Sequence, residues 1–456
     1  MDNKEETPMK RMLIGGTHSG CGKTTIVCAI LAALKARGLS VSSFKCGPDY
    51  IDPMFHKSII GAESYNLDSF FCDDNTLRNL LCMNSKNSDI SVIEGVMGYY
   101  DGVGGRGSAH SVSMATETPS VVVIDCKGAS ESIGAVMRGF IDYEVPNRIK
   151  GFIFNRLPER LVPLARGICE KLGTRYFGCF PVNSFSLESR RLGLVTADEV
   201  ADLKEKTLEL GALAEKHILL DELLAAAEAP LPEYSPLKVK RLFRNGKPKI
   251  AVAKDKAFCF IYDENLQLLE QLGCEIQFFS PISDEKLPEN CCGLFLSGGY
   301  PELHADELSA NRGMLAAVKS AVASGMPTIA ECGGFMYLHE AMKTTDGLEH
   351  KMAGVLNGTA YETARLQRFG YVTLTACEDS LICRKGQKIA AHEFHYWDST
   401  DCGSSFTARK ADGREWSCIH GGKSLYAGFP HLYFYTDISI AERFAAACAE
   451  FGGIYG

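Results

Sequence analysis

The feature that most constrains the fold of this chain is a glycine-rich segment near its N-terminus, Gly15–Thr25, with the sequence GGTHSGCGKTT. An apolar run at residues 12–14 precedes it, and a segment with apolar residues at helical spacing, residues 26–34, follows it. This order predicts a strand, a tight loop and a helix. Such a loop directs backbone N–H groups at an anion, and the N-terminus of the helix adds partial positive charge. The segment therefore predicts a phosphate-binding loop.

The loop also carries the side chains that nucleotide phosphates and Mg²⁺ require. We expect Lys23 to reach the terminal phosphates and the hydroxyl of Thr24 to bind Mg²⁺. The usual spacing of a phosphate loop would place glycine at position 17, where this chain has threonine, and Gly16 fits a loop that is one residue longer. We predict an ATP site here, with the binding residues Gly16, Gly20, Gly22, Lys23, Thr24 and Thr25.

Length and composition limit the class of protein. A chain of 456 residues is long enough for two domains with separate cores. Its net charge of −8 is opposite to the basic surface that nucleic-acid binding requires, and no apolar run is long enough to span a membrane. The charged N-terminus lacks the apolar core of a signal peptide, and the 18 cysteines include no Cys-x-x-Cys pair. We expect a cytoplasmic protein that binds neither nucleic acid nor membranes.

Strand and helix patterns alternate along the first half. Short runs rich in β-branched residues are typical of buried strands in a parallel sheet with helices on both faces. These runs lie at residues 12–14, 41–44, 90–93, 121–124 and 152–154. Residues 201–227 have a helical composition, and proline punctuates the stretch that follows. We predict an α/β domain over residues 10–228 and a linker over residues 229–247.

A second series of strands and helices begins near residue 250. Expected strands lie at 250–253, 275–279, 293–296 and 328–330, and expected helices at 265–272 and 314–323. From about 355 to 435, glycine-separated runs rich in Thr, Tyr and Phe predict an antiparallel extension. A last helix is expected over residues 441–449. We predict a second α/β domain over residues 248–452.

Charged residues follow the second and third predicted strands of the first domain. Ligands of open α/β sheets bind at the carboxyl ends of strands, and Mg²⁺ takes few protein oxygens and keeps its waters. We therefore predict that Lys45 contacts ATP and that Asp49, Asp52 and Glu94 join Thr24 in binding Mg²⁺. An aspartate-rich turn bounded by prolines, without a metal, is the alternative.

Residues 327–335 of the second domain combine an apolar strand, one cysteine and two glycines before a helical run. This arrangement predicts a nucleophile elbow, a sharp turn that presents Cys332 and leaves the following N–H groups for an oxyanion. We expect the helix N-terminus to favour the thiolate. The alternative is one more buried cysteine. His431, in an apolar strand-like run, is the expected base for Cys332, although such a histidine by itself is more often a core residue.

These motifs together resemble the cobyrinate a,c-diamide synthase family. In the first half the resemblance rests on GTHSGCGKTT, KCGPDYIDP from Lys45, NLD from Asn66 and EGVMGYYDG from Glu94. The synthetase half of this family resembles dethiobiotin synthetase, which has the same longer phosphate loop. The second half resembles class I glutamine amidotransferase domains, in which SGGYPE from Ser297 matches the loop on the oxyanion side.

The resemblance implies a two-domain ligase that uses ATP, Mg²⁺ and L-glutamine to amidate the a and c carboxylates of cobyrinic acid, through acyl phosphates, in cobalamin biosynthesis. It implies Cys332 as nucleophile with His431 as base, and the amides of Gly299 and Gly333 as oxyanion donors. It further implies Tyr50 and Asp101 at the corrin and Asn155 at the adenine. A monomer or homodimer is expected.

Three departures and ambiguities stay open. The family's RHLGL is RRLGL here, so the role of Arg191 is undefined. Many class I amidotransferases have a glutamate two residues after the histidine, whereas this chain has Tyr433, which leaves the orientation of His431 unexplained. The stretch HEFH at His392–His395 is one residue too short for a zinc motif, and in a strand its two histidines fall on opposite faces. We assign no metal to this stretch. A structural role and a role near the interface of the glutaminase and synthetase domains are equally compatible with its sequence.

Three alternative functions compete with the main prediction. The same chemistry on another tetrapyrrole, such as nickel sirohydrochlorin, would use the same two domains. Cobyric acid synthase is a relative that lacks the GPDYID segment found from Gly47. A phosphate-loop switch ATPase with a vestigial glutaminase module comes from a different class, and the Cys332–His431 pair counts against it.

Overall fold

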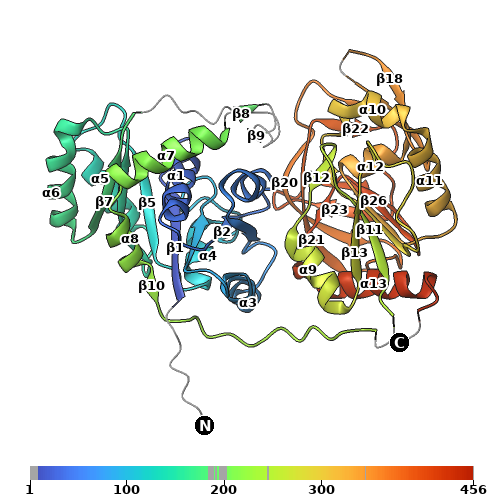
Figure 1. Cartoon of the computed structure of the whole chain (residues 1–456), viewed down its shortest axis with the longest axis horizontal. Coiled ribbons are helices and arrows are strands. Elements are labelled where there is room, and N and C mark those ends of the chain that lie inside the picture. The colour runs from blue at the N-terminus through green and yellow to red at the C-terminus, as the bar shows by residue number, and fades with distance from the viewer. Residues whose placement is uncertain are drawn as a thin grey trace, which may run out of the picture. The chain divides into compact units, whose positions relative to one another are not determined.

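The structure is a computed structural model that describes residues 9–182, 189–190, 193–194, 203–243, 246–344 and 346–454. The chain divides into two compact units, Met1–Leu237 and Lys238–Gly456 (Figure 1). Each unit is built around its own mostly parallel sheet, so the predicted α/β architecture with two domains is confirmed. In the described part of the chain, no helix is both long enough and apolar enough to cross a membrane. Arg191 lies outside the described residues.

The first unit is organised around seven parallel strands in the order β3-β2-β4-β1-β5-β6-β7. Their bounds are β1 Met9–Gly16, β2 Val41–Cys46, β3 Glu63–Leu67, β4 Ile90–Glu94, β5 Ser120–Asp125, β6 Ile149–Asn155 and β7 Arg175–Phe180. A short strand, β10 (Glu228–Ala229), pairs antiparallel with β1. Because β1 is central, the loop that follows it lies at the middle of the carboxyl edge of the sheet.

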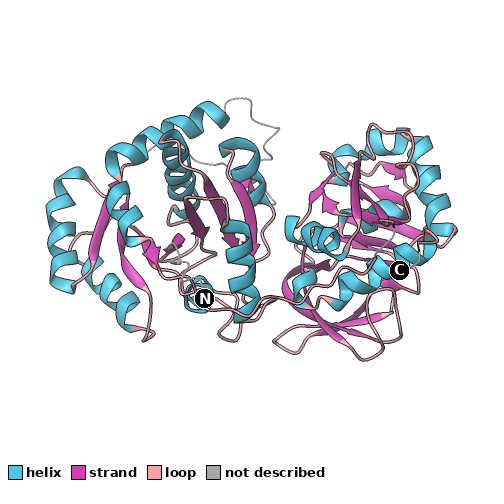
Figure 2. Cartoon of the chain, turned by 60° about the horizontal axis from the view of Figure 1, so that its bottom comes forward, coloured by secondary structure: helices cyan, strands magenta, loops and turns pink. Residues whose placement is uncertain are grey.

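Helices lie on both sides of this sheet (Figure 2). Their bounds are α1 Lys23–Ala36, α2 Ile51–Phe55, α3 Asp74–Ser85, α4 Ala109–Ala115, α5 Ile133–Asp142, α6 Val162–Leu172, α7 Leu203–His217 and α8 Leu220–Ala226. The stretch of helical composition at 201–227 contains two helices, α7 and α8. The helical conformation is interrupted between them because Leu219 donates its N–H to the carbonyl of Phe177 at 2.8 Å and so joins the edge of β7.

The second unit has a central sheet in the order β13-β11-β14-β16-β26-β25. Its strands are β11 Lys249–Ala253, β13 Glu275–Phe279, β14 Gly293–Leu296, β16 Thr328–Glu331 and β26 Leu425–Gly428, all parallel, with β25 His420–Gly421 antiparallel at one edge. Its helices are α9 Asp263–Leu272, α10 Ala305–Ala310, α11 Arg312–Ala323, α12 Gly333–Leu338 and α13 Ser439–Phe451.

Two further sheets and a short strand pair complete the second unit. One sheet has the order β24-β23-β20-β21-β27 and is antiparallel throughout, as the sequence predicts for this region. Its strands are β20 Arg368–Ala376, β21 Lys388–His395, β23 Phe406–Arg409, β24 Glu415–Cys418 and β27 His431–Leu432. The other sheet contains β17 His339–Lys343, β18 Glu349–Lys351, β19 Leu356–Glu362 and β22 Trp397–Ser399, while β12 Phe258–Phe260 pairs with β15 Gly298–Gly299. His431 thus begins the strand that enters the antiparallel sheet.

The proline-punctuated stretch after β10 is held by side chains of α3. Asn75 and Ser235 exchange two hydrogen bonds, of 3.0 and 2.7 Å, and Arg78 donates to the carbonyl of Glu233 at 2.8 Å. Further along, Leu242 donates its N–H to the carbonyl of Leu272, in the second unit. Backbone groups in an irregular stretch need partners, and here both units supply them.

Candidate active site

The phosphate loop connects β1 to α1 in a conformation that depends on glycine. Gly20 and Gly22 have φ angles of 79° and 97°, a region that side chains disfavour. A Cβ on Gly16 would overlap the Sγ atom of Cys21, so this position also requires glycine. Lys23 is buried at the start of α1, where it donates to the carbonyl of His18 at 3.4 Å, and burial lowers the pKa of Lys23. A bound phosphate group would supply the negative charge that favours the protonated form of the Lys23 amine.

Charged side chains converge beside the loop from neighbouring elements. Lys45 at the end of β2 and Glu94 at the end of β4 are direct partners in the parallel ladder. The ammonium of Lys45 lies 2.9 Å from Glu94 Oε1 and also pairs with Asp52 of α2. The Thr24 hydroxyl donates to Glu94 Oε1 at 2.6 Å. The structure therefore brings together four residues that the sequence assigned to ATP and Mg²⁺.

The charges of the two aspartates differ because their surroundings differ. Burial, followed by the nearby charge of Asp52, raises the pKa of Asp49 to about 7. Burial also acts against ionisation of Asp52, but the adjacent Lys45 ammonium lowers the pKa of Asp52 below its usual value. Asp52 therefore stays ionised at neutral pH. A cation bound nearby would lower the pKa of Asp49 and so favour its carboxylate form.

These residues fit a Mg²⁺ ion that is shared with phosphates. In the described residues, no group of three His, Cys, Asp or Glu side chains is arranged to hold a metal by itself. Mg²⁺ is typically held by one or two carboxylates, water and the phosphates of its substrate. The Thr24 hydroxyl and the Glu94 carboxylate, 2.6 Å apart at the first turn of α1, supply oxygens of this kind.

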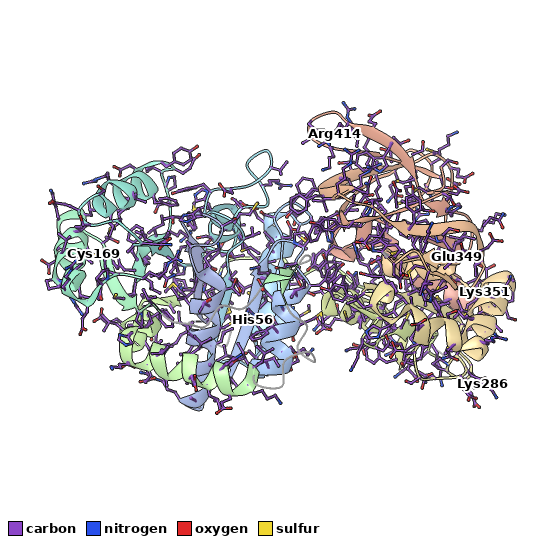
Figure 3. All side chains as sticks on the ribbon, turned by 90° about the horizontal axis from the view of Figure 1, so that it is seen from above. His56, Cys169, Lys286, Glu349, Lys351 and Arg414 are labelled. Carbon is purple, nitrogen blue, oxygen red and sulfur yellow. The ribbon has the colours of Figure 1, made fainter. Side chains whose placement is uncertain are left out.

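His56 also belongs to this cluster, and the sequence reasoning missed it. Its Nδ1 lies 2.7 Å from the Ser43 hydroxyl and its Nε2 lies 3.5 Å from Glu94 Oε2. The side chain is in the interior of the first unit (Figure 3), where burial lowers its pKa to about 4. The available signal was its position four residues after Asp52, one helical turn away.

The other predicted residues of this unit have structural partners. Asn155, at the end of β6, donates to the carbonyl of Cys21 at 2.8 Å and packs against Gly22, so it supports the phosphate loop. Asp101 accepts the N–H of Gly98 at 2.7 Å in the loop after β4. Tyr50 is buried at the start of α2, and Thr25 is half-buried in α1. Contacts of Asn155 with adenine and of Tyr50 and Asp101 with a corrin stay predictions.

In the second unit, Cys332 lies at a sharp turn between β16 and α12. Its φ and ψ angles are 48° and −102°, a strained combination that the surrounding bonds maintain. Its N–H donates to the carbonyl of Gly428 at 2.8 Å, and its carbonyl accepts the N–H of Met336 at 2.9 Å. A strained residue between a buried strand and a helix has the geometry of a nucleophile elbow.

The two predicted oxyanion donors lie next to each other at this turn. Gly299 has a φ of 156°, and a Cβ there would overlap the carbonyl of Ala257. A Cβ on Gly333 would lie 3.2 Å from the backbone nitrogen of Gly299 and 2.9 Å from Pro301. Both positions therefore need glycine because backbone segments approach closely, which is the condition for two N–H groups to face one oxygen atom.

The N–H of Gly333 at the start of α12 lowers the pKa of the Cys332 thiol, as the sequence predicts, but this effect is outweighed. Burial, with an added contribution from the Glu302 carboxyl, raises the pKa of Cys332 well above its usual value. Helix α12 has only six residues, and its dipole does not outweigh burial among carboxyl groups. Ionisation of Cys332 therefore requires a base that takes its proton directly.

His431, the predicted base, is held by groups that sequence reasoning did not connect with it. Its Nδ1 lies 3.5 Å from Oε2 of Glu331, the residue directly before the nucleophile. Its ring stacks on that of His392, its ladder partner in β21, with centroids 4.9 Å apart and an angle of 22°. The stretch at 392–395, whose role the sequence left open, thus packs against the candidate base. His395 stacks in turn on Phe429 at 4.0 Å.

Comparisons with known proteins cover both units. Residues 12–184 match the family model of the CobQ/CobB/MinD/ParA nucleotide binding domain, and residues 249–437 match the CobB/CobQ-like glutamine amidotransferase domain. The chain is 37% identical over 448 residues to cobyrinate a,c-diamide synthase of Caldanaerobacter subterraneus, covering 96% of this chain and 98% of that protein. The enzymes of the same name from Listeria innocua and Clostridium acetobutylicum are 36% and 37% identical, and 99% of each is covered.

Proposed function

The chain belongs to the cobyrinate a,c-diamide synthase family, and from this premise we propose that it amidates the a and c carboxylates of cobyrinic acid, using ATP and glutamine, in cobalamin biosynthesis. The observation that supports the proposal is a separate group of candidate residues in each unit. In one unit Thr24 of the phosphate loop bonds to the buried Glu94, and in the other Glu331, the residue directly before Cys332, lies 3.5 Å from His431. A ligase that takes nitrogen from glutamine requires both.

The glutaminase half-reaction follows from the second site. The Cys332 thiol attacks the carboxamide carbon of glutamine while His431 takes the thiol proton. The N–H groups of Gly299 and Gly333 stabilise the negative oxygen of the tetrahedral intermediate. As the carbon–nitrogen bond breaks, His431 returns the proton to the leaving nitrogen, and ammonia departs. Water then hydrolyses the Cys332 thioester to glutamate, with His431 again accepting a proton.

The ligase half-reaction follows from the first site. A carboxylate of the substrate attacks the γ-phosphorus of ATP, which releases ADP and leaves an acyl phosphate. Ammonia displaces the phosphate to form the amide. Lys23 and Lys45 hold the phosphate oxygens, and the N–H groups of the loop that contains Gly20 and Gly22 surround them. Mg²⁺ held by Thr24, Glu94 and the aspartates Asp49 and Asp52 would supply charge neutralisation. Tyr50 and Asp101 are proposed to contact the macrocycle. We further propose a cytoplasmic monomer or homodimer.

The first experiment measures amide formation by mass spectrometry with purified protein, ATP, Mg²⁺ and glutamine. Cobyrinic acid and nickel sirohydrochlorin are offered separately. We expect cobyrinic acid to gain two amides. We expect Cys332→Ala to lose at least about a thousandfold with glutamine, because the nucleophile is gone, and to keep its rate with free ammonia.

The matched control is Cys377→Ala, which removes an exposed cysteine and should change neither rate. Amidation of the nickel compound alone would contradict the proposed substrate and leave the mechanism intact. Slow ATP turnover with no amide formed on either compound would contradict the ligase proposal and favour a switch ATPase.

A further inference from the structure

We infer that Glu331 is the positioning residue that orients His431 for proton transfer from Cys332. This inference rests on the proposed glutaminase reaction and adds a third member to its cysteine and histidine. Tyr433 stands where many class I amidotransferases have the orienting glutamate. Here the carboxylate near the histidine belongs to Glu331, which directly precedes the nucleophile and is 100 residues away from His431 in sequence.

The carboxylate of Glu331 binds both the ring and the backbone of the histidine segment. Oε2 lies 3.5 Å from His431 Nδ1, and Oε1 accepts the N–H of Leu432 at 3.1 Å. The side chains of His431 and Glu331 are 3% and 2% exposed, so water does not compete for these contacts. Glu331 at the end of β16 therefore connects the two residues: it directly precedes Cys332 in the chain, and its carboxylate contacts the His431 segment.

The remaining sides of the His431 ring are also enclosed. A Cβ on Gly298 would lie 2.5 Å from its Cε1, and His392 covers one face of the ring. Burial, followed by the charge of His431, lowers the pKa of His392 well below its usual value, so His392 is neutral at physiological pH. Asn265 of α9 fixes the adjoining backbone, because it donates to the carbonyl of Leu432 at 2.9 Å and accepts the N–H of Phe434 at 2.7 Å.

This arrangement selects the tautomer that proton transfer requires. With a carboxylate opposite Nδ1, the imidazole proton resides on Nδ1, and Nε2 is the nitrogen whose lone pair accepts the thiol proton in the proposed reaction. Once His431 is charged, the buried carboxylate stabilises the imidazolium, and the 3.5 Å separation should shorten to that of a charge-assisted hydrogen bond. Burial raises the pKa of Glu331, whereas the hydrogen bond to His431 and the charge of His431 act in the opposite direction and favour the carboxylate.

Two other carboxyl groups affect the charge of Cys332, and one provides a control. Glu302, from the turn after Gly299, and Glu393 of β21 both raise the pKa of the thiol, as does Glu331 through its charge. If Glu331 acted only as a nearby charge, its neutralisation would make the thiol ionise at lower pH. If it orients and stabilises His431, the same change should have the opposite effect. The direction of the shift therefore separates the two roles.

The experiment measures glutamine hydrolysis by Glu331→Gln, Glu331→Asp and Glu393→Gln in the full chain. The amide oxygen of Glu331→Gln can still accept the Leu432 N–H, but its NH₂ group faces Nδ1 and favours the wrong tautomer. We expect kcat to fall about 10²- to 10³-fold, with KM for glutamine changed less than about threefold. Glu331→Asp should recover at least about tenfold of this loss, since it keeps the charge. Glu393→Gln is the control for the effect of a nearby charge on the thiol, which the second readout measures.

A second readout follows the rate at which iodoacetamide alkylates Cys332 as a function of pH, measured by mass spectrometry of the peptide that contains it. We expect the midpoint of this profile to move to higher pH in Glu331→Gln and to lower pH in Glu393→Gln. Ammonia-dependent amidation reports on the intact first unit and should be unchanged in all three variants.

The inference is overturned if Glu331→Gln keeps wild-type kcat, or if its alkylation midpoint moves to lower pH as in the control. Loss of activity together with a lower melting temperature and no recovery in Glu331→Asp would assign Glu331 a purely structural role and also overturn it. If wild-type protein hydrolyses no glutamine, the proposed function fails instead, and the alkylation profiles still decide whether Glu331 acts on His431.

Discussion

Glu302 illustrates how a single half-buried carboxyl group gives the protein a measurable pH dependence. It lies in the turn after Gly299, and burial, with a smaller effect from Glu362, raises its pKa to about 7. A carboxyl group whose pKa is higher in the folded state stabilises the fold fully below its unfolded value of about 4.3. This contribution is lost as the pH rises through about 7, because the folded protein must then hold a partly desolvated negative charge.

We therefore predict that Glu302→Gln becomes more stable relative to wild type as the pH rises. The glutamine side chain resembles the neutral acid at every pH, so the melting temperature of the variant minus that of wild type should increase by a few degrees between about pH 5 and about pH 7.5. Differential scanning fluorimetry measures this difference. Glu289→Gln, at an exposed position, should show no such trend. A constant difference for Glu302→Gln would show that Glu302 titrates normally.

At the scale of elements, the contact of α12 with β14 positions the cysteine elbow. A Cβ on Gly334, in the first turn of α12, would overlap the carbonyl of Leu296 at the end of β14. Helix α12 thus packs directly against β14, and this contact fixes the position of Cys332 at the N-terminus of the helix. A backbone carbonyl within a sheet cannot move aside as a flexible side chain can, so this contact is sensitive to one added methyl group.

We predict that Gly334→Ala destabilises the second unit by about 1–3 kcal/mol and lowers glutamine hydrolysis at least about tenfold. The matched control is Gly139→Ala in α5, where nothing lies within 4 Å of the added Cβ. Because alanine is the better helix former, the control should be neutral or stabilising by less than about 1 kcal/mol. Urea unfolding and glutaminase assays make the comparison. Equal stabilities of the two variants would contradict the close contact of α12 with β14.

At the scale of the whole molecule, each unit has its own hydrophobic core. The first core gathers buried residues of β1, α1, β4, β5 and α7 among others, and the second gathers residues of β11, β14, β16, α11 and α12. No residue is shared between these two clusters. Units with separate cores unfold with their own free energies, and a ligand stabilises the unit that binds it.

We predict that Mg²⁺ with a non-hydrolysable ATP analogue raises the melting temperature of one of two unfolding transitions. At a ligand concentration about 100 times its Kd, the gain is about 2.7 kcal/mol. Lys23→Ala should abolish this shift and leave the other transition unchanged, and removal of Mg²⁺ by EDTA should reduce it. Calorimetry makes the measurement. An equal shift of both transitions would contradict independent cores.

The sequence alone was sufficient for features that depend on neighbouring residues. The phosphate loop requires an apolar run, glycines and Lys23 within about a dozen positions, and the elbow at Cys332 requires a strand, a nucleophile and two glycines in succession. Parallel sheets are likewise recognisable, because buried strands are short, apolar and β-branched. The composition of residues 201–227 indicates helix but does not reveal the interruption at Leu219, which bonds to β7.

Only the tertiary structure decided which side chains meet and what charge they carry. Glu331 reaches His431 across 100 residues because β16 and β26 are neighbouring strands, and His56 reaches Glu94 because β2 lies beside β4. The raised pKa of Cys332 depends on burial among carboxyl groups from three separate segments. Strand order and desolvation are properties of chain segments that are distant in sequence and adjacent in space, so no local pattern encodes them.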